Sequence, residues 1–314
     1  MNFRRAAALS SPRNATGAAM KRRYVTLDVF TERRFAGNPL AVVLDTDDLD
    51  TEAMQAIANE FNLPETVFLL PPENADHRAR CRIFTPRREL PFAGHPTVGT
   101  AVLLAARDGG KSHDFVLEEQ IGRIRCRVTP REGGGEASFT LPAQPQRVAS
   151  APDNDVIAAA LGVTPDEIGF DGIGPSCWSA GNPFLFVPVR GLEAVRKAAP
   201  DLARFAALPA DNSAMFVFTR ETVEKDHDFH ARMFAPRMGI IEDPATGSAA
   251  AAFAGLLGRF GGYGDGEHKV AIEQGYEMGR PSLIRLGMTR VAGQFTAVTV
   301  GGNAVIVAEG AIEA

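Results

Sequence analysis

Two short turns combine small residues with titratable ones, and each leads into an apolar stretch. Gly-His-Pro-Thr at 94–97 precedes one stretch, and Asp-Pro-Ala-Thr-Gly-Ser at 243–248 precedes the other. If the stretches are helices, the unpaired backbone N–H groups and positive dipole at each start can bind an anion without a basic side chain. Alternatively, Asp243 and the hydroxyl groups only cap the helices. The first interpretation predicts that a substrate carboxylate is bound by Gly94, Thr97, Gly247 and Ser248.

Three side chains near these turns could carry a proton. Matching the turns makes His95 the counterpart of Asp243, and a helix N-terminus favours an ionised aspartate and a neutral histidine. Glu65 lies between an amphipathic segment and an apolar run, where neighbours such as Phe68 would raise its pKa toward neutrality, as acid or base catalysis at pH 7 requires. The match of His95 with Asp243 is an offset of 148 residues, and the same offset makes Ser213 the counterpart of Glu65. This carboxylate therefore occurs in one half only. We expect Glu65, His95 and Asp243 to be catalytic, with capping and structural roles as the alternative.

The turns belong to an internal duplication. Ala-Gly-Asn-Pro at 36–39 recurs at 180–183, and Arg-Ile-Phe-Thr-Pro-Arg at 82–87 recurs as Arg-Met-Phe-Ala-Pro-Arg at 232–237. The turns themselves follow in the same order, which indicates two like halves. We place these halves at 24–138 and 142–314, with the seam at the Gly-rich run 133–135 and the Pro-containing stretch 142–152. The last strand could return to the first half.

The apolar stretches predict the architecture. Residues 98–106 and 249–257 contain essentially no charged residue, and a helix that is apolar all round must be enclosed. Most of the remaining chain reads as strands, apart from an amphipathic helix over 51–61. The sequence therefore predicts an α+β fold of two similar domains, each a curved sheet or barrel around a central buried helix. A doubly wound dinucleotide-binding fold is the rival, but its Gly-rich fingerprint is missing.

Composition limits the function classes. The 314 residues are 45% hydrophobic and 23% charged, with no stretch long enough to span a membrane. A net charge of −5 without a basic stripe argues against nucleic acid as a partner. Three cysteines are too few for a disulfide framework or a zinc site, which favours a cytoplasmic location. Residues 1–23 are basic and lack acidic residues, so we expect a disordered extension there, with a transit peptide as the alternative.

Other candidates for chemistry are weaker. His227 and His230 could hold a metal, but we expect them on opposite faces of a strand and predict no metal site. Cys81 and Cys177 lie outside the two turns, and we interpret them as core residues. Arg280 could contact a substrate acid or could equally be a solvated surface residue.

Several motifs together resemble the PhzF family of phenazine biosynthesis-like isomerases, over nearly the whole chain from Tyr24. The resemblance implies the diaminopimelate epimerase-like fold, catalysis without a cofactor, and a homodimer. The motifs that carry it are Phe-Ala-Gly-Asn-Pro at 35–39, Asn-Leu-Pro-Glu-Thr at 62–66, Phe-Ala-Gly-His-Pro-Thr at 92–97, Glu-Asp-Pro-Ala-Thr-Gly-Ser-Ala at 242–249, Gln-Gly at 274–275 and Met-Gly-Arg-Pro-Ser at 278–282.

The same resemblance implies roles for single residues. The acid/base glutamate of the family falls on Glu65, its histidine on His95, its aspartate on Asp243, and its substrate-binding glycine and serine on Gly94 and Ser248. We therefore expect an isomerase that moves a proton on a small carboxylate. An epimerase or racemase that uses Glu65 with Asp243 or His95 stays open, as does a non-catalytic binding protein. The two catalytic cysteines of diaminopimelate epimerases are absent, and the natural substrate does not follow from the sequence.

Overall fold

The computed structural model describes residues 20–109, 111, 113–209, 212 and 214–314. The predicted N-terminal extension falls mostly on residues 1–19, which lie outside this part of the chain. Folding was expected to begin near Tyr24, but strand β1 begins at Lys21. The earlier start has a physical reason, because the buried Arg22 guanidinium donates two hydrogen bonds to the carboxylate of Asp48.

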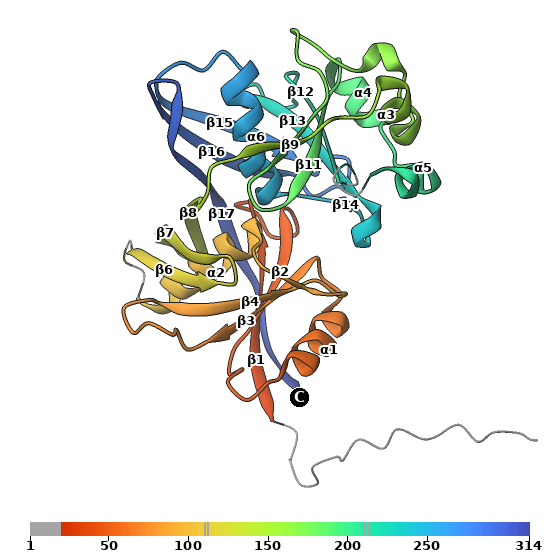
Figure 1. Ribbon diagram of the computed structural model, residues 1–314. Coiled ribbons are helices and arrows are strands. Elements are labelled where there is room, and N and C mark those ends of the chain that lie inside the picture. The colour runs from red at the N-terminus through yellow and green to blue at the C-terminus, as the bar shows by residue number, and fades with distance from the viewer. Residues whose placement is uncertain (1–19, 110, 112, 210–211, 213) are drawn as a thin grey trace, which may run out of the picture.

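The chain forms two lobes, and each wraps a sheet around one helix (Figure 1). The N-terminal lobe encloses α2 between its strands, while α1 covers the outside of the sheet. Its elements are β1 (Lys21–Val29), β2 (Asn38–Val43), α1 (Thr51–Phe61), β3 (Glu65–Leu70), β4 (Ala79–Phe84), β5 (Glu89–Leu90), α2 (Gly94–Arg107), β6 (His113–Glu119), β7 (Gly122–Arg131) and β8 (Gly134–Thr140).

The C-terminal lobe encloses α6 in the same way. Two short 3₁₀ turns, η1 (Pro165–Glu167) and η3 (Pro236–Met238), interrupt it. The other elements are β9 (Gln146–Ala149), α3 (Asn154–Leu161), β10 (Ser176–Ser179), β11 (Pro183–Pro188), α4 (Gly191–Lys197), α5 (Leu202–Ala207), β12 (Met215–Thr219), β13 (Phe229–Ala235), β14 (Ile240–Asp243), α6 (Gly247–Phe260), β15 (Gly266–Gln274), β16 (Ser282–Val291) and β17 (Gln294–Glu313).

Strand β17 joins the two lobes. It begins beside β16, continues beside β8, and ends antiparallel to β1, where Glu313 lies opposite Lys21. In Figure 1 it runs as one dark blue ribbon from the upper lobe into the lower one. The sequence predicted a seam at the Gly-rich run. Instead Gly133 lies in the hairpin between β7 and β8, inside the N-terminal lobe.

Both central helices are buried on nearly every side, as their lack of charge predicted. In α6 every residue from Ala249 to Leu257 is buried, and Phe253 stacks with Phe186 and meets Phe218 edge-on. In α2 burial extends from Gly94 to Ala105. The predicted α+β fold, with a sheet around a central helix in each half, is confirmed. No helix among the described residues is both long and apolar enough to cross a membrane.

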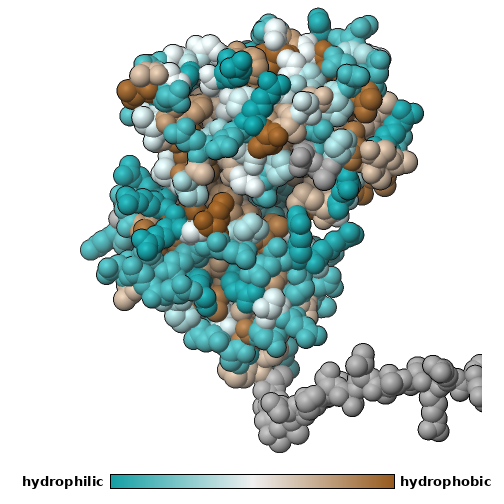
Figure 2. Space-filling model, in the orientation of Figure 1, coloured by the Kyte–Doolittle hydropathy of each residue, from teal (hydrophilic) through white to brown (hydrophobic). Residues whose placement is uncertain are grey.

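On the face drawn in Figure 2, hydrophilic side chains cover most of the lower, N-terminal lobe. Hydrophobic side chains come to the surface at the junction of the lobes. The junction is therefore the less polar part of this face, and the two central helices begin there.

Candidate active site

The N-termini of the two central helices meet tip to tip between the lobes. A methyl group added at Gly94 would lie 2.8 Å from the Cα atom of Gly247 and 3.0 Å from the backbone nitrogen of Ser248. Neither N-cap residue, Ala93 or Thr246, caps its helix with a side-chain hydrogen bond. Two positive helix ends without a side-chain cap therefore meet in close backbone contact between the lobes, an arrangement suited to an anion if the lobes part.

The structure changes the register of the duplication at this point. Both helices are 14 residues long, and they begin at Gly94 and Gly247. His95 therefore corresponds to Ser248, and the expected equivalence of His95 and Asp243 is wrong. Asp243 ends strand β14, four residues before the helix begins. The sequence match aligned Pro96 with Pro244. Pro96 lies inside the first turn of α2, whereas Pro244 precedes α6, so the two matched residues occupy different positions relative to their helices.

The strand ladders also correct the counterpart of Glu65. Thr66 is equivalent to Met215, because each lies opposite the phenylalanine of the repeated Arg-x-Phe motif. Ala214 is therefore the counterpart of Glu65. Ser213, the expected one, lies outside the described residues. The carboxylate remains unique to the N-terminal lobe.

Glu65 and His95 lie together beneath the helix tips. The Nε2 atom of His95 is 3.4 Å from the Oε2 atom of Glu65, and both side chains are buried. The His95 ring bonds to the Pro39 carbonyl, while its Nε2 atom has no hydrogen-bond partner. Nδ1 therefore carries the hydrogen, which leaves Nε2 of the neutral ring as an acceptor aimed at Glu65.

Burial controls the protonation of this pair. It lowers the pKa of His95 to about 3, so the ring is neutral at physiological pH. Burial also raises the pKa of Glu65 well above its ordinary value, and the negative charge of Asp243 raises it further. The raised pKa favours the acid form of Glu65, whose Oε2 atom lies beside the free nitrogen of His95 without a hydrogen bond between them.

Asp243 approaches the helix tips from the C-terminal lobe, held by a partner from each lobe. Asn38 donates to its Oδ1 atom at 2.9 Å, and the hydroxyl of Thr246 donates to Oδ2 at 2.6 Å. Burial raises the pKa of Asp243 to about 6, although both hydrogen bonds lower it. Burial therefore raises the pKa of both carboxyl groups, and the charge of Asp243 adds to the rise at Glu65.

Three buried acceptors at the site have no hydrogen-bond partner. They are the Oε2 atom of Glu65, the Nε2 atom of His95 and the Oδ1 atom of Asn38. The amide of Asn38 cannot turn over to relieve this, because its nitrogen donates both to Asp243 and to the carbonyl of Ala245. Buried acceptors without partners are costly, so the site is arranged to receive hydrogen-bond donors.

Most of the predicted site residues come together, and Thr97 does not join them. Glu65, His95 and Asp243 converge on the helix tips, which Gly94 and Gly247 form. Ser248 is half-buried in the first turn of α6. The hydroxyl of Thr97 is instead bonded to the Ala93 carbonyl and to Glu119, both at 2.7 Å. The hydroxyl of Thr97 is therefore already engaged, and a substrate contact by this residue stays a prediction.

Comparison with known proteins gives this geometry a family. The family model described as phenazine biosynthesis-like protein matches residues 27–310. The chain belongs to this family. A relative from Mesorhizobium japonicum, named an uncharacterized isomerase, is 50% identical over 92% of this chain and 98% of its own. The trans-2,3-dihydro-3-hydroxyanthranilate isomerase of Pseudomonas chlororaphis is 37% identical over 92% and 98%. Like these relatives, this member of the family is an isomerase.

Solved structures agree with the family assignment. A Bacillus anthracis phenazine biosynthesis protein of the PhzF family matches with a TM-score of 0.85, at 26% identity, over 94% of this chain and 100% of that one. A hydroxyproline epimerase from Agrobacterium vitis has a TM-score of 0.63 at 13% identity, over 93% and 91% of the two chains. The second likeness shows only the fold, which phenazine biosynthesis-like proteins share with such epimerases.

In this phenazine biosynthesis-like protein the partly exposed Arg280 side chain is engaged in hydrogen bonds within the protein. Its Nη2 atom donates to Asp28 at 2.5 Å and to the Ala36 carbonyl at 2.8 Å, and its Nε atom donates to the Gly37 carbonyl at 2.7 Å. These bonds fix the loop that leads into Asn38. Arg280 thus supports Asp243 indirectly, through the loop that positions Asn38. The sequence suggested either a substrate contact or a solvated surface residue, and neither included this role.

Sequence reasoning also missed the polar residues that hold Asp243. Gln274 donates to the backbone carbonyl of Asp243 and to the Thr246 hydroxyl, and its own carbonyl accepts from the Thr246 N–H. Asn38 and Gln274 both belong to motifs that carry the family resemblance. Their place in those motifs could have marked them as candidate site residues.

The weaker candidates are structural. His227 and His230 do not lie on opposite faces, because the Nδ1 atoms of both bond to Glu273 at 2.7 Å. No cluster suited to a metal occurs among the residues that the structure describes. Cys81 and Cys177 are buried, in line with their interpretation as core residues.

Proposed function

We propose that this isomerase holds the carboxylate of a small substrate between the tips of α2 and α6 and moves a proton with Glu65. The carrying observation is that the buried carboxyl of Glu65, which has no counterpart in the C-terminal lobe, lies near Asp243 where two helix starts without a side-chain cap meet. Gly94, Gly247 and Ser248 allow the backbone to approach the substrate closely. Because Glu65 and His95 are buried, the lobes separate to admit the substrate and close over it.

In the proposed reaction Glu65 acts first as a base and then as an acid. Glu65 in its ionised form removes a hydrogen from one carbon as H⁺, and the electron pair of that bond moves into the conjugated system. The resulting Glu65 acid returns the proton to another carbon of the same skeleton, so a double bond moves and no other reactant is consumed. Neutral His95 accepts a hydrogen bond from the acid form and keeps it oriented toward the gap.

The substrate that we propose to test first is trans-2,3-dihydro-3-hydroxyanthranilate. The Pseudomonas chlororaphis relative is named for isomerising it and matches almost its whole length to this chain. The unpartnered acceptors of Asn38 and His95 suit a substrate that carries N–H or O–H groups beside its carboxylate.

Epimerisation is the second candidate, and one observation favours it. Asp243 comes from the opposite lobe, its charge acts on Glu65, and its pKa is raised to about 6. Two groups on opposite sides of a carbon could remove and return a proton with inversion. Asp243 is, however, fully hydrogen-bonded by Asn38 and Thr246, so we propose that it orients the substrate.

Proton NMR in deuterium oxide tests the proposal. The wild-type protein should convert trans-2,3-dihydro-3-hydroxyanthranilate to a product with a moved double bond and solvent deuterium at the new C–H position. The Glu65→Gln variant should lose at least about a hundredfold in turnover, whereas Glu60→Gln, at an exposed residue of α1, should retain it. Inversion at one carbon would support the epimerase instead. Binding without exchange would support a non-catalytic protein, and an active Glu65→Gln variant would refute the role of Glu65.

A further inference from the structure

A carboxylate clamp marks equivalent positions in the two lobes. Glu118, in β6, and Glu273, in β15, each accept hydrogen bonds from two successive backbone N–H groups and bond to a histidine Nδ1 atom at matching positions, and Glu273 also bonds to the Nδ1 atom of His230. The donors stand 150 residues apart in the two lobes: Glu73, Asn74 and His77 for Glu118, and Val223, Glu224 and His227 for Glu273. The residues that follow the clamps, Glu119 and Gln274, are therefore structural equivalents.

Glu119 and Gln274 each form a hydrogen bond with a threonine at the start of the central helix in their own lobe. Gln274 bonds to Thr246, the N-cap of α6, through its neutral amide. Glu119 bonds to Thr97 in the first turn of α2, with its Oε1 atom 2.7 Å from the threonine oxygen. Each side chain supports the start of a central helix. A protonated glutamic acid has nearly the shape of a glutamine, so the neutral amide of one lobe suggests a neutral acid in the other.

The number of hydrogens available at the Thr97 hydroxyl also indicates that Glu119 is a neutral acid. The threonine oxygen lies 2.7 Å from both the Ala93 carbonyl and Glu119. A hydroxyl has one hydrogen to donate, and a carbonyl can only accept. Thr97 must therefore donate to Ala93 and accept from Glu119, which requires a hydrogen on Glu119. If Glu119 were ionised, one of these two short contacts would join two oxygens with no hydrogen between them.

The surroundings of Glu119 favour the neutral form. The side chain is buried, and burial raises its pKa to about 8 even when Thr97 donates to the ionised form, a bond that lowers the pKa. The groups packed nearby are the neutral thiols of Cys81 and Cys126, whose own pKa values burial raises. No cation among the described residues lies within ion-pair distance of Glu119.

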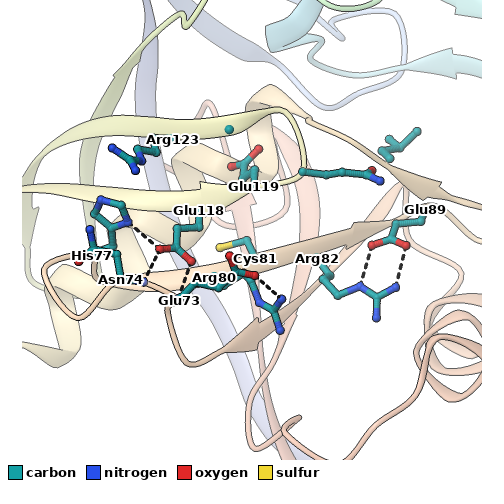
Figure 3. A pocket seen from close by; sticks show the side chains of 13 residues that line it. Glu73, Asn74, His77, Arg80, Cys81, Arg82, Glu89, Glu118, Glu119 and Arg123 are labelled. Carbon is teal, nitrogen blue, oxygen red and sulfur yellow. Dashed lines mark hydrogen bonds and ion pairs between the residues drawn. The ribbon is translucent and has the colours of Figure 1, made fainter.

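A pocket of about 610 Å³ connects this acid to solvent (Figure 3). The charged groups around it are largely paired with one another. The dashed lines join Arg80 to Glu73, Arg82 to Glu89, and His77 to Glu118, while none reaches Glu119. Arg123 and Gln120 also line the pocket. Protons can therefore exchange with Glu119 through the pocket, although no neighbour neutralises its charge.

We propose that Glu119 is a positioning residue that acts as a neutral carboxylic acid, bonding Thr97 and so holding the first turn of α2, which carries Gly94 and His95. Loss of its proton makes Thr97 turn its hydrogen from Ala93 to Glu119, and the start of the helix must shift. Alkaline pH therefore loosens the helix tip that binds the substrate. The kinetic readout rests on the proposed function, whereas the unfolding readout needs no substrate.

The Glu119→Gln variant tests the proposal, because glutamine keeps the donor and removes the titration. For the wild type we expect the contribution of Glu119 to the urea midpoint to fall as pH rises from its ordinary pKa of 4.5 to about 8, because over this range only the unfolded protein has lost the proton. The variant midpoint should change less. Turnover of the variant at pH 7 should stay within about threefold of wild type, and the fall in kcat above pH 8 should disappear. Glu119→Ala should lose turnover at every pH.

Thr97→Val is the second variant, because it removes the partner and leaves the acid. Its kcat should be lower at pH 7 but should also lack the fall above pH 8. A folded Glu119→Gln protein that loses more than about tenfold in turnover at pH 7 would show that the charge is needed, and would overturn the proposal. A wild-type alkaline fall that persists in both variants would also overturn it. If the unfolding result holds while no variant or wild-type protein turns over the substrate, only the proposed function fails.

Discussion

Replacing Gly94 by alanine perturbs the meeting point of the two helices and little else. The new methyl carbon would lie 2.8 Å from the carbonyl carbon and the Cα atom of Gly247. Carbon atoms in contact normally stand about 3.5–4.0 Å apart, so the tips must separate by roughly 1 Å. Such overpacking typically costs about 1–3 kcal/mol of unfolding free energy. A misplacement of about 1 Å at a reacting centre can cost about a hundredfold in rate.

We therefore expect Gly94→Ala to fold, with a modest loss of stability, and to lose far more in turnover. Urea unfolding measures the first effect, and the NMR assay on trans-2,3-dihydro-3-hydroxyanthranilate measures the second. Gly174→Ala is the matched control, because no atom lies within 4 Å of a methyl group added there. If Gly94→Ala turned over the substrate at the wild-type rate, the helix tips would not form the binding site.

Two further predictions concern the groups behind the tips. His95 has its pKa lowered by burial to about 3 in the folded protein, so it contributes stability above about pH 6.5 that is lost as pH falls toward 3, at most about 5 kcal/mol. His95→Asn should therefore lose less unfolding free energy than wild type between pH 7 and pH 4 in urea titrations, and equal losses would contradict the buried neutral ring. Arg280→Ala should cost about 2–4 kcal/mol, because it removes three hydrogen bonds and leaves the buried Asp28 carboxylate without its cation. It should also slow turnover by loosening the loop before Asn38, and unchanged kinetics would separate that loop from the site.

Much of the fold follows from local patterns in the sequence. The amphipathic helix at 51–61 lies where its apolar spacing predicts, and Asp50 caps it by accepting from the Ala53 N–H. The two uncharged stretches are enclosed helices, because only burial suits a helix without a polar face. The long course of β17 was not predictable in the same way, since its pairing with β1 joins opposite ends of the chain.

The sequence indicated which residues gather at the site better than it indicated how they are arranged. Glu65, His95 and Asp243 converge, although the register that matched His95 with Asp243 was wrong. Sequence similarity aligned two prolines, whereas the backbone aligns the two helix starts at Gly94 and Gly247. Glu119 escaped notice because a carboxylate in a strand looks like an ordinary surface residue until its burial is known. Comparing Glu119, which follows Glu118, with Gln274, which follows Glu273, draws attention to Glu119.

The most direct measurement is a crystal structure of the inactive Glu65→Gln variant with trans-2,3-dihydro-3-hydroxyanthranilate bound. We predict that the substrate carboxylate lies between the lobes, within about 2.7–3.2 Å of backbone nitrogens in the first turns of both α2 and α6. The amide of residue 65 should face the carbon that loses its proton. A substrate bound in the outer pocket of Figure 3, or held by only one lobe with residue 65 out of reach, would contradict the account.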